Sequence, residues 1–151
     1  MAFKFKFEAI LNLKVRMEDM KKAELRRISK ELEDEKEKLK NLMQEREVLY
    51  EKVREKSSRG ITKQELITFN NYVSVLKRKI TNQKSVIFEI STRLDKVRQE
   101  LVKVSQEKKM FEILKEKKYD EYMKEYYKKE QEVVDNLISF RFSGGEIDDP
   151  S

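Results

Sequence analysis

Apolar side chains recur along residues 66–104 at spacings that alternate between three and four, which is the pattern of the buried stripe, or seam, of a coiled coil. A β-strand would instead repeat every two residues. The seam positions are Leu66, Phe69, Val73, Leu76, Ile80, Gln83, Ile87, Ile90, Leu94, Val97, Leu101 and Val104. Only Gln83 among them is polar, so this stretch predicts a long helix that needs a partner.

Composition supports a narrow helical core. Of the 151 residues, 42% are charged and 38% hydrophobic, too little apolar material for a wide globular core and too regular a pattern for disorder. The helix breakers are confined to Gly60, Gly144, Gly145 and Pro150. We therefore expect a chain that is almost entirely helical.

The charges are interleaved rather than collected in one basic block. Lys and Arg number 35 against 29 Asp and Glu. This mixture is typical of a solvated coiled-coil face and predicts no nucleic-acid binding, while the excess of Lys favours acidic partners. There is no cysteine and no histidine, so we expect no disulfide, no zinc or haem and no other cofactor. With no glycine-rich phosphate loop and no histidine base, we expect no enzyme.

A second seam precedes the first. It starts as Ile10, Leu13, Met17 and Met20 and reappears one residue later as Leu25, Ile28, Leu32, Glu35, Leu39, Leu42, Arg46, Leu49 and Val53. Such a phase slip is expected where a straight helix is reset against a seven-residue repeat. We interpret Glu35 and Arg46 as polar core positions that fix register and partner number.

The only interior break lies at residues 57–61. Gly60 suits a helix end, Thr62 and Glu65 have the spacing of a capping box, and Ile61 and Leu66 that of a hydrophobic staple, so a second helix should start near Lys63. A short turn folds two such helices back on each other. The prediction is an all-α, long antiparallel two-helix coiled-coil hairpin whose second helix is longer than the first, with Glu8 opposite residues around 110.

We expect this hairpin to be a single coiled-coil domain. Its predicted parts are a phenylalanine-rich N-terminal arm at 1–7, helix 1 at 8–56, a turn at 57–62, helix 2 at 63–141 with a projecting C-terminal part, and a flexible tail at 142–151.

Two regions carry apolar residues outside the seams. The arm holds Phe3, Phe5 and Phe7, which either fold back on the chain's own helices, dock on a partner or insert into a membrane surface; the next helix has no wide apolar face, which disfavours membrane insertion. The projecting part of helix 2 has the apolar stripe of a docking surface, covered alternatively by the arm or by a second copy. Its members are Tyr119, Tyr122, Tyr126, Tyr127, Val133, Val134, Leu137 and Phe140.

Near the hairpin tip, Val48, Ile67 and Val75 fall outside the seams, flanked by Tyr50 and Tyr72. Several such residues at one end indicate a partner site, although the two tyrosines are expected to widen the core. The opening residues lack the apolar core of a signal peptide, and no segment has the apolar length of a membrane span. We expect a soluble intracellular protein.

Both ends of the chain resemble the flagellar FliJ family. The N-terminal likeness lies in Phe3-Lys4-Phe5, Phe7, Leu11, Leu13 and Lys14, followed by Ala23-Glu24-Leu25. The C-terminal likeness lies in Lys129-Glu130-Gln131, Asp135, Leu137 and Arg141, similar to the family's closing E-Q-x-x-x-D-x-L-x-x-x-R.

The resemblance implies a small bacterial component of the flagellar type III export apparatus, folded like the stalk of rotary ATPases. It would be cytoplasmic and peripherally associated with the membrane through that apparatus. Its implied partners are the export ATPase hexamer, the cytoplasmic domain of the export gate protein and export chaperones. The arm and the projecting helix would engage the ATPase, and the tip side would face the gate.

Three alternatives stay open: a generic coiled-coil spacer that homodimerises, a holdase that grips unfolded clients with tip residues, and the virulence-type secretion counterpart of the same stalk.

Overall fold

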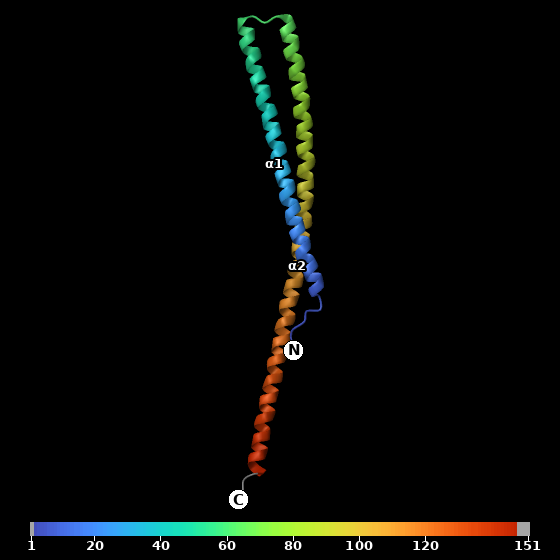
Figure 1. Ribbon diagram of the computed structural model, residues 1–151, viewed down its shortest axis with the longest axis vertical. Helices are drawn as coiled ribbons and strands as arrows, with labels where there is room; N and C mark the ends of the chain where they lie inside the picture. Colours follow the sequence, from blue (N-terminus) through green and yellow to red (C-terminus); the bar gives the residue numbers. More distant parts are fainter. Residues whose placement is uncertain (1, 148–151) are drawn as a thin grey trace. The chain divides into compact units, whose positions relative to one another are not determined.

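The computed structural model describes residues 2–147, with side chains to residue 143. It contains helix α1, Glu8–Arg59, and helix α2, Lys63–Ile147, and no strand among the described residues (Figure 1). Contacts divide the chain into two compact units. We call Glu18–Lys103 the hairpin unit, and Met1–Met17 together with Val104–Ser151 the terminal unit. The sequence analysis expected one domain.

In the hairpin unit the two helices run antiparallel and side by side (Figure 1). The predicted seam of α2 forms the core: Leu76 is 1% exposed, and Ile80 is also buried. A central cluster joins residues of both helices, namely Ile28, Leu32, Ile90, Leu94 and Val97. Leu66, nearest the tip, is exposed. The predicted fold class is therefore confirmed.

The turn follows the predicted capping chemistry. Gly60 has φ +101°, a left-handed conformation that glycine adopts without steric cost. The backbone N–H of Glu65 donates to Thr62 Oγ1 at 3.2 Å, and α2 begins at Lys63. Helix α1 continues to Arg59, three residues beyond the expected end at 56. Ser58 Oγ donates to the Glu55 carbonyl and Arg59 pairs with Glu55, so side chains stabilise this last turn.

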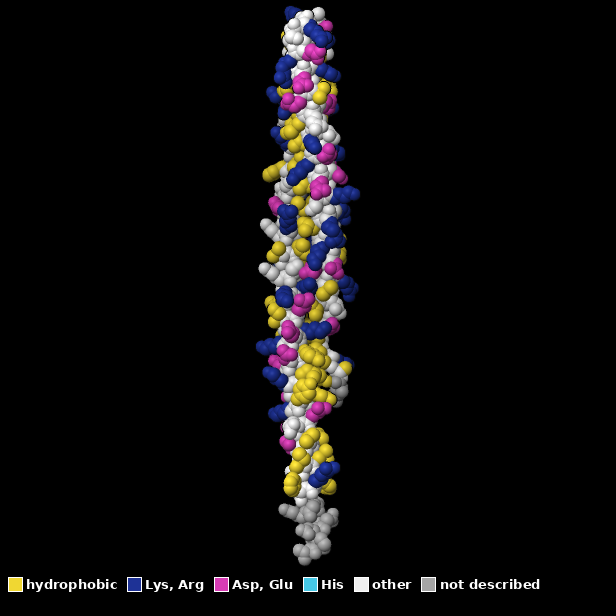
Figure 2. Space-filling view, turned by 90° about the vertical axis from the view of Figure 1, so that its left-hand side faces the viewer, with side chains coloured by type: hydrophobic (Ala, Val, Ile, Leu, Met, Phe, Trp, Pro, Cys, Tyr) yellow, Lys and Arg dark blue, Asp and Glu magenta, His cyan; other side chains and the backbone are white. Residues whose placement is uncertain are grey.

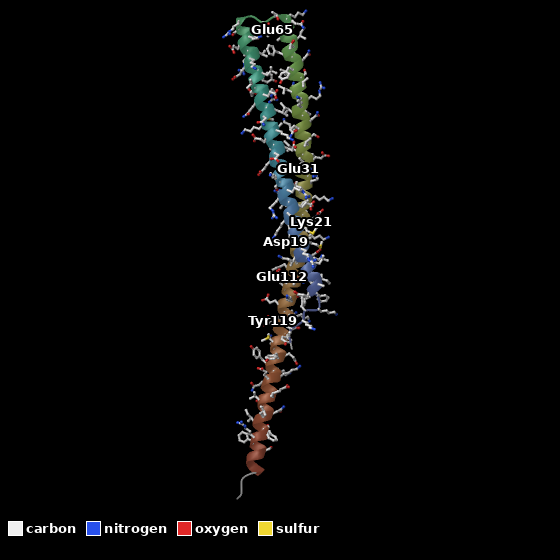
Figure 3. All side chains as sticks on the ribbon, in the orientation of Figure 1. Asp19, Lys21, Glu31, Glu65, Glu112 and Tyr119 are labelled. Atoms are coloured by element: carbon white, nitrogen blue, oxygen red, sulfur yellow. The ribbon has the colours of Figure 1, made fainter. Side chains whose placement is uncertain are left out.

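Polar side chains also form contacts between the two helices of the hairpin unit. Lys21 Nζ lies 2.5 Å from a Glu100 carboxylate oxygen, and an Arg93 guanidinium nitrogen lies 3.1 Å from one of Glu31. Nearer the tip, the Tyr72 hydroxyl donates to Glu45. Figure 3 labels Lys21 and Glu31 on α1. These contacts define the antiparallel register of the unit.

The predicted phase slip in the first helix is wrong. Leu13 and Met20 are exposed, at 51% and 70%, and Ile10 is exposed as well, whereas Leu11 and Glu18 are buried. Counting back from Leu25 in steps of four and three gives Lys21, Glu18, Lys14 and Leu11, so the seam keeps its phase through polar residues. This is possible because a lysine stem packs along an apolar surface while its ammonium group reaches a carboxylate. Lys14 accordingly lies 2.6 Å from Glu107, within the terminal unit.

In the terminal unit, the start of α1 packs beside α2, with Leu11 and Val104 buried. Glu8 pairs with Lys115 at 3.0 Å, so it lies further along α2 than the expected level near residue 110. Pairing continues past the apolar seam because charged and aromatic residues replace the aliphatic ones.

The expected flexible tail at 142–151 is wrong over 142–147, where α2 continues to Ile147. Gly144 and Gly145 cost a helix only about 1 kcal/mol each, unlike an interior proline. The remaining tail residues, 148–151, lie outside the described part of the chain. Across the described helices, none has the length and apolarity that crossing a bilayer requires.

Candidate partner-binding surfaces

The phenylalanine-rich arm folds back on α2. The Phe3 ring centroid lies 5.4 Å from that of Tyr119 and 5.5 Å from that of Tyr122. The Phe7 ring lies 6.1 Å from that of Phe111. Residues 2–5 have no regular secondary structure, and the Glu8 N–H donates to the Phe5 carbonyl where α1 begins. Of the three fates considered for the arm, folding back is the one that the structure shows.

From the level of the arm onward, α2 presents a row of apolar side chains, which we call the C-terminal stripe: Tyr119, Tyr122, Tyr126, Val133, Leu137 and Phe140. Most are separated by three, four or seven residues and so share one helix face. Figure 2 shows hydrophobic side chains gathered along this part of α2, next to the residues drawn in grey. All six are exposed except Tyr122, which is half-buried under Phe3.

The middle of the stripe is hollowed. A surface hollow of about 660 Å³ is lined by Tyr122, Glu125, Tyr126, Lys129, Glu130, Val133 and Val134. The Tyr122 and Tyr126 rings stack at 6.5 Å, and Tyr126 contacts Tyr127 edge-on at 5.9 Å. A hydrogen bond to Glu130, which also lines the hollow, raises the pKa of Tyr126 above its usual 10.0. The hollow thus has an apolar floor with charged edges.

Sequence reasoning missed the end of this surface. Ile138 and Phe142 are also exposed, Phe142 at 73%. The signal was available, because both residues continue the apolar content of the helix. The expected helix end at 141 excluded Phe142, and Ile138 was not among the eight apolar residues named for the projecting part of helix 2.

Most of the predicted tip-side residues are exposed. Val48, Ile67, Tyr72 and Val75 are all at the surface, whereas Tyr50 is half-buried. The expectation that both tyrosines widen the core is therefore wrong for Tyr72, which is 43% exposed. The hydrogen bond to Glu45 fixes the Tyr72 side chain and raises its pKa. Val48 lines a hollow of about 620 Å³ built wholly from α1 residues, so it does not share one hollow with the α2 residues of the set.

The tip-side stretch of α2 also has a distinctive charge, which the sequence analysis did not include. No Asp or Glu occurs between Glu65 and Glu89. Within this interval Lys77, Arg78, Lys79 and Lys84 are all exposed. The stretch of α2 that carries Ile67, Tyr72 and Val75 and continues to Lys84 therefore has only positive charges.

The surfaces described are suited to contacts between proteins. Among residues 2–143, no group of three or more acidic side chains comes close enough to hold a metal ion. The fold and these surfaces define a class: an all-α protein built on an antiparallel two-helix coiled coil, with exposed apolar residues on both units.

Comparison with known proteins identifies the family. A family model described as "Flagellar FliJ protein" matches residues 3–146. The chain therefore belongs to the flagellar FliJ protein family, whose members are components of the type III export apparatus. It is 26% identical over 142 residues to the flagellar FliJ protein of Bacillus subtilis (strain 168), covering 94% of this chain and 97% of that one.

The fold is also found in a solved structure. A structure from Chlamydia trachomatis, described as that of a YscO homolog, matches with a TM-score of 0.69 at 21% identity. The match covers 98% of this chain and 100% of the other. At this identity the likeness concerns the fold.

Proposed function

We propose that this protein is a non-enzymatic stalk of the flagellar export apparatus that joins the export ATPase hexamer to the cytoplasmic domain of the export gate protein. The observation that carries the proposal is the C-terminal stripe, which leaves large apolar side chains of a long helix in contact with solvent. Water disfavours such a surface, and a partner that covers it gains the burial energy. The family membership supports the flagellar rather than the virulence-type role.

The ATPase docks on the terminal unit in this proposal. Phe3, Phe5 and Phe7 of the arm together with the C-terminal stripe supply the apolar contact. A helix that presents anchors at three- and four-residue spacings fits an apolar groove or sleeve in a partner. The hollow is also lined by three charged residues, Glu125, Lys129 and Glu130. Their charges set the orientation of the docked partner.

The gate protein docks on the tip side of the hairpin unit, through Val48, Tyr50, Ile67, Tyr72 and Val75. Because the α2 part of this surface carries four exposed cations and no acidic residue between Glu65 and Glu89, the matching gate surface should be acidic. Export chaperones are the third class of partner in the proposal. The protein works in the cytoplasm and is held at the membrane face only through the apparatus.

The mechanism needs no catalytic residue. Rotation or closure of the ATPase subunits changes the contacts on the stripe, and the paired helices pass that change to the gate contact. Helices packed along an aliphatic core with polar cross-contacts resist bending within the hairpin unit. A Gly-Pro substitution in the middle of that unit should therefore stop export even where both partners still bind.

Co-elution of the purified protein with each partner tests the proposal. The partners are the export ATPase and the gate protein's cytoplasmic domain from the same bacterium, run by size-exclusion chromatography at low micromolar concentration. Deleting residues 119–141 should abolish ATPase binding and leave gate binding intact. Binding to neither partner, with a stable dimer of the chain itself, would instead assign the stripe to homodimerisation.

A further inference from the structure

We infer that the arm, residues 2–7, is a displaceable cover of the upper part of the C-terminal stripe, so that a partner must release it to occupy the whole stripe. The inference rests on the proposed function for the identity of that partner, the export ATPase. It assigns the arm a regulatory role in addition to any contact of its own.

The cover is held by ring contacts. Phe3 lies against both Tyr119 and Tyr122, edge-on to the first at 77° and tilted by 48° to the second. The ring contact of Phe5 is with Phe7, at 5.9 Å, and not with α2. Figure 3 places Tyr119 at the level of the arm. Phe3 is therefore the residue that closes the cover.

Several features make the cover reversible. Residues 2–5 form neither helix nor strand, so releasing them breaks no ladder of backbone hydrogen bonds. Lys4 and Lys6, on either side of Phe5, are exposed and remain hydrated in both states. The three phenylalanines are only half-buried, so the closed state loses some of the burial energy that a core phenylalanine has. The cover is thus weaker than the helix pairing beneath it.

Tyr122 links the cover to the partner surface. It contacts Phe3 on one side and lines the hollow with Tyr126 and Val133 on the other. A partner side chain that enters the hollow and reaches Tyr119 meets Phe3 already in place. The arm and the partner therefore compete for the same rings, and the apparent affinity for the partner is the intrinsic affinity multiplied by the fraction of molecules in which the arm is open.

The absence of cysteine from the chain permits a direct test. The double variant F3C/Y119C locks the arm closed when oxidised and frees it when reduced. We expect the oxidised protein to bind the export ATPase at least tenfold more weakly than the reduced protein. Equal affinities of the oxidised and reduced forms would overturn the inference.

Matched variants separate the cover from general effects. K4Q changes an exposed residue of the arm that is outside the proposed ATPase contact, so its affinity should stay within twofold of wild type. F3C/D120C places the second thiol about 100° around the helix from position 119. It should form its disulfide at least tenfold more slowly than F3C/Y119C, and equal rates would mean that the arm does not dock.

These readouts distinguish two failures. If the wild-type protein does not bind the ATPase, the proposed function fails. In that case the arm is tested by the equilibrium between glutathione and the disulfide of F3C/Y119C. If the arm is a displaceable cover, a measurable fraction of F3C/Y119C stays reduced, with the arm open. Complete closure at every glutathione concentration would show a permanent part of the fold and would overturn the inference.

Discussion

The Gln83 side-chain amide donates to two oxygens of Glu35, the backbone carbonyl at 2.9 Å and the carboxylate at 2.5 Å. Both residues are seam positions, so the contact places one polar pair inside a largely aliphatic core. A shift of the helices by one heptad would set Glu35 opposite Leu76 or Ile90 instead. Either shift takes the Gln83 amide away from the Glu35 carboxylate and sets the carboxylate against an aliphatic side chain, which is costly.

Replacing this pair by leucines should trade specificity for stability. The variant E35L/Q83L should melt at a higher temperature than the wild type, because aliphatic seam residues pack without desolvating polar groups. It should also lose its unique register. Cysteine pairs can be placed in separate variants, some at positions that face each other in the native register and others at positions shifted by one heptad. Oxidation then reports which of the two registers is populated. If only the native pair crosslinks in E35L/Q83L, the register is fixed by other contacts.

The Lys21 and Glu100 pair should make stability depend on pH. The hydrogen bond from Lys21 lowers the pKa of Glu100 below 4.5, and the bond to Glu100, more than that to Glu24, raises the pKa of Lys21 above 10.5. The Glu100 contribution is therefore present above pH 4.5 and lost as the pH falls through its folded pKa. The Lys21 contribution is present below 10.5 and lost as the pH rises through its folded pKa.

The variant E100Q should accordingly lose stability less steeply than the wild type below pH 4.5. Urea unfolding at a series of pH values between 2.5 and 7 measures this. Some slope should persist, because the hydrogen bond from Gln83, with a further one from Lys38, also lowers the pKa of Glu35. An acid limb as steep as that of the wild type would show that the pair contributes nothing.

Substitution of Gly60 should destabilise the turn without any clash. Nothing lies within 4 Å of a Cβ added there, so the cost comes only from the left-handed backbone at φ +101°. G60A should lower the free energy of unfolding by about 1–2 kcal/mol. G60N should cost less, because asparagine tolerates this conformation better. The urea midpoint should therefore fall in the order wild type, G60N, G60A. A G60A variant with the midpoint of the wild type would contradict this prediction.

Truncation of Leu76 should be the most damaging single change in the seam. It is the most fully buried large side chain, at 1% exposure, and L76A should cost about 2–5 kcal/mol. The matched control is L66A at the exposed tip end of the same seam, with about 1 kcal/mol or less. Urea unfolding monitored by circular dichroism measures both. Equal losses would mean that the core extends evenly to the tip.

Polar substitution in the C-terminal stripe should remove binding without unfolding the chain. L137S/F140S should weaken ATPase binding by at least tenfold and leave the melting temperature within a few degrees. F88S is the matched control, since Phe88 and Phe140 are 75% and 76% exposed but only Phe140 belongs to the stripe. If F88S weakens binding equally, the loss reflects general surface hydrophobicity rather than a site.

Much of the fold could be predicted because periodicity and turn chemistry are local. The three- and four-residue spacing identified the buried face of α2, and Gly60 with Thr62 located the start of that helix. The buried face of the first turns of α1 could not be predicted this way, because after Leu11 it continues through the half-buried Lys14 and Lys21 and the buried Glu18. Hydropathy therefore pointed to Leu13 and Met20, which face solvent. Only the partner carboxylates Glu100 and Glu107, about 80 to 90 residues away, make the lysines interior.

The candidate surfaces could be predicted because they consist of apolar residues that lie outside the seams. The contacts between these surfaces could not be predicted. Whether Phe3 would lie on a partner or on Tyr119 depends on tertiary contact between residues at opposite ends of the chain. The basic character between Glu65 and Glu89 was readable from the sequence, yet only exposure of all four cations makes it a surface property.

The helix pairing has a consequence for the order in which the chain assembles. Lys56 and Glu65, beside the turn, are nine residues apart in sequence, whereas Glu8 and Lys115 are 107 apart. Closing a short loop costs less entropy than closing a long one, so pairing should start at the turn and proceed away from it. The rings that receive the arm, on Phe111, Tyr119 and Tyr122, are synthesised more than 100 residues after Phe3 and Phe7. The arm phenylalanines thus stay uncovered on the growing chain until these rings have been made.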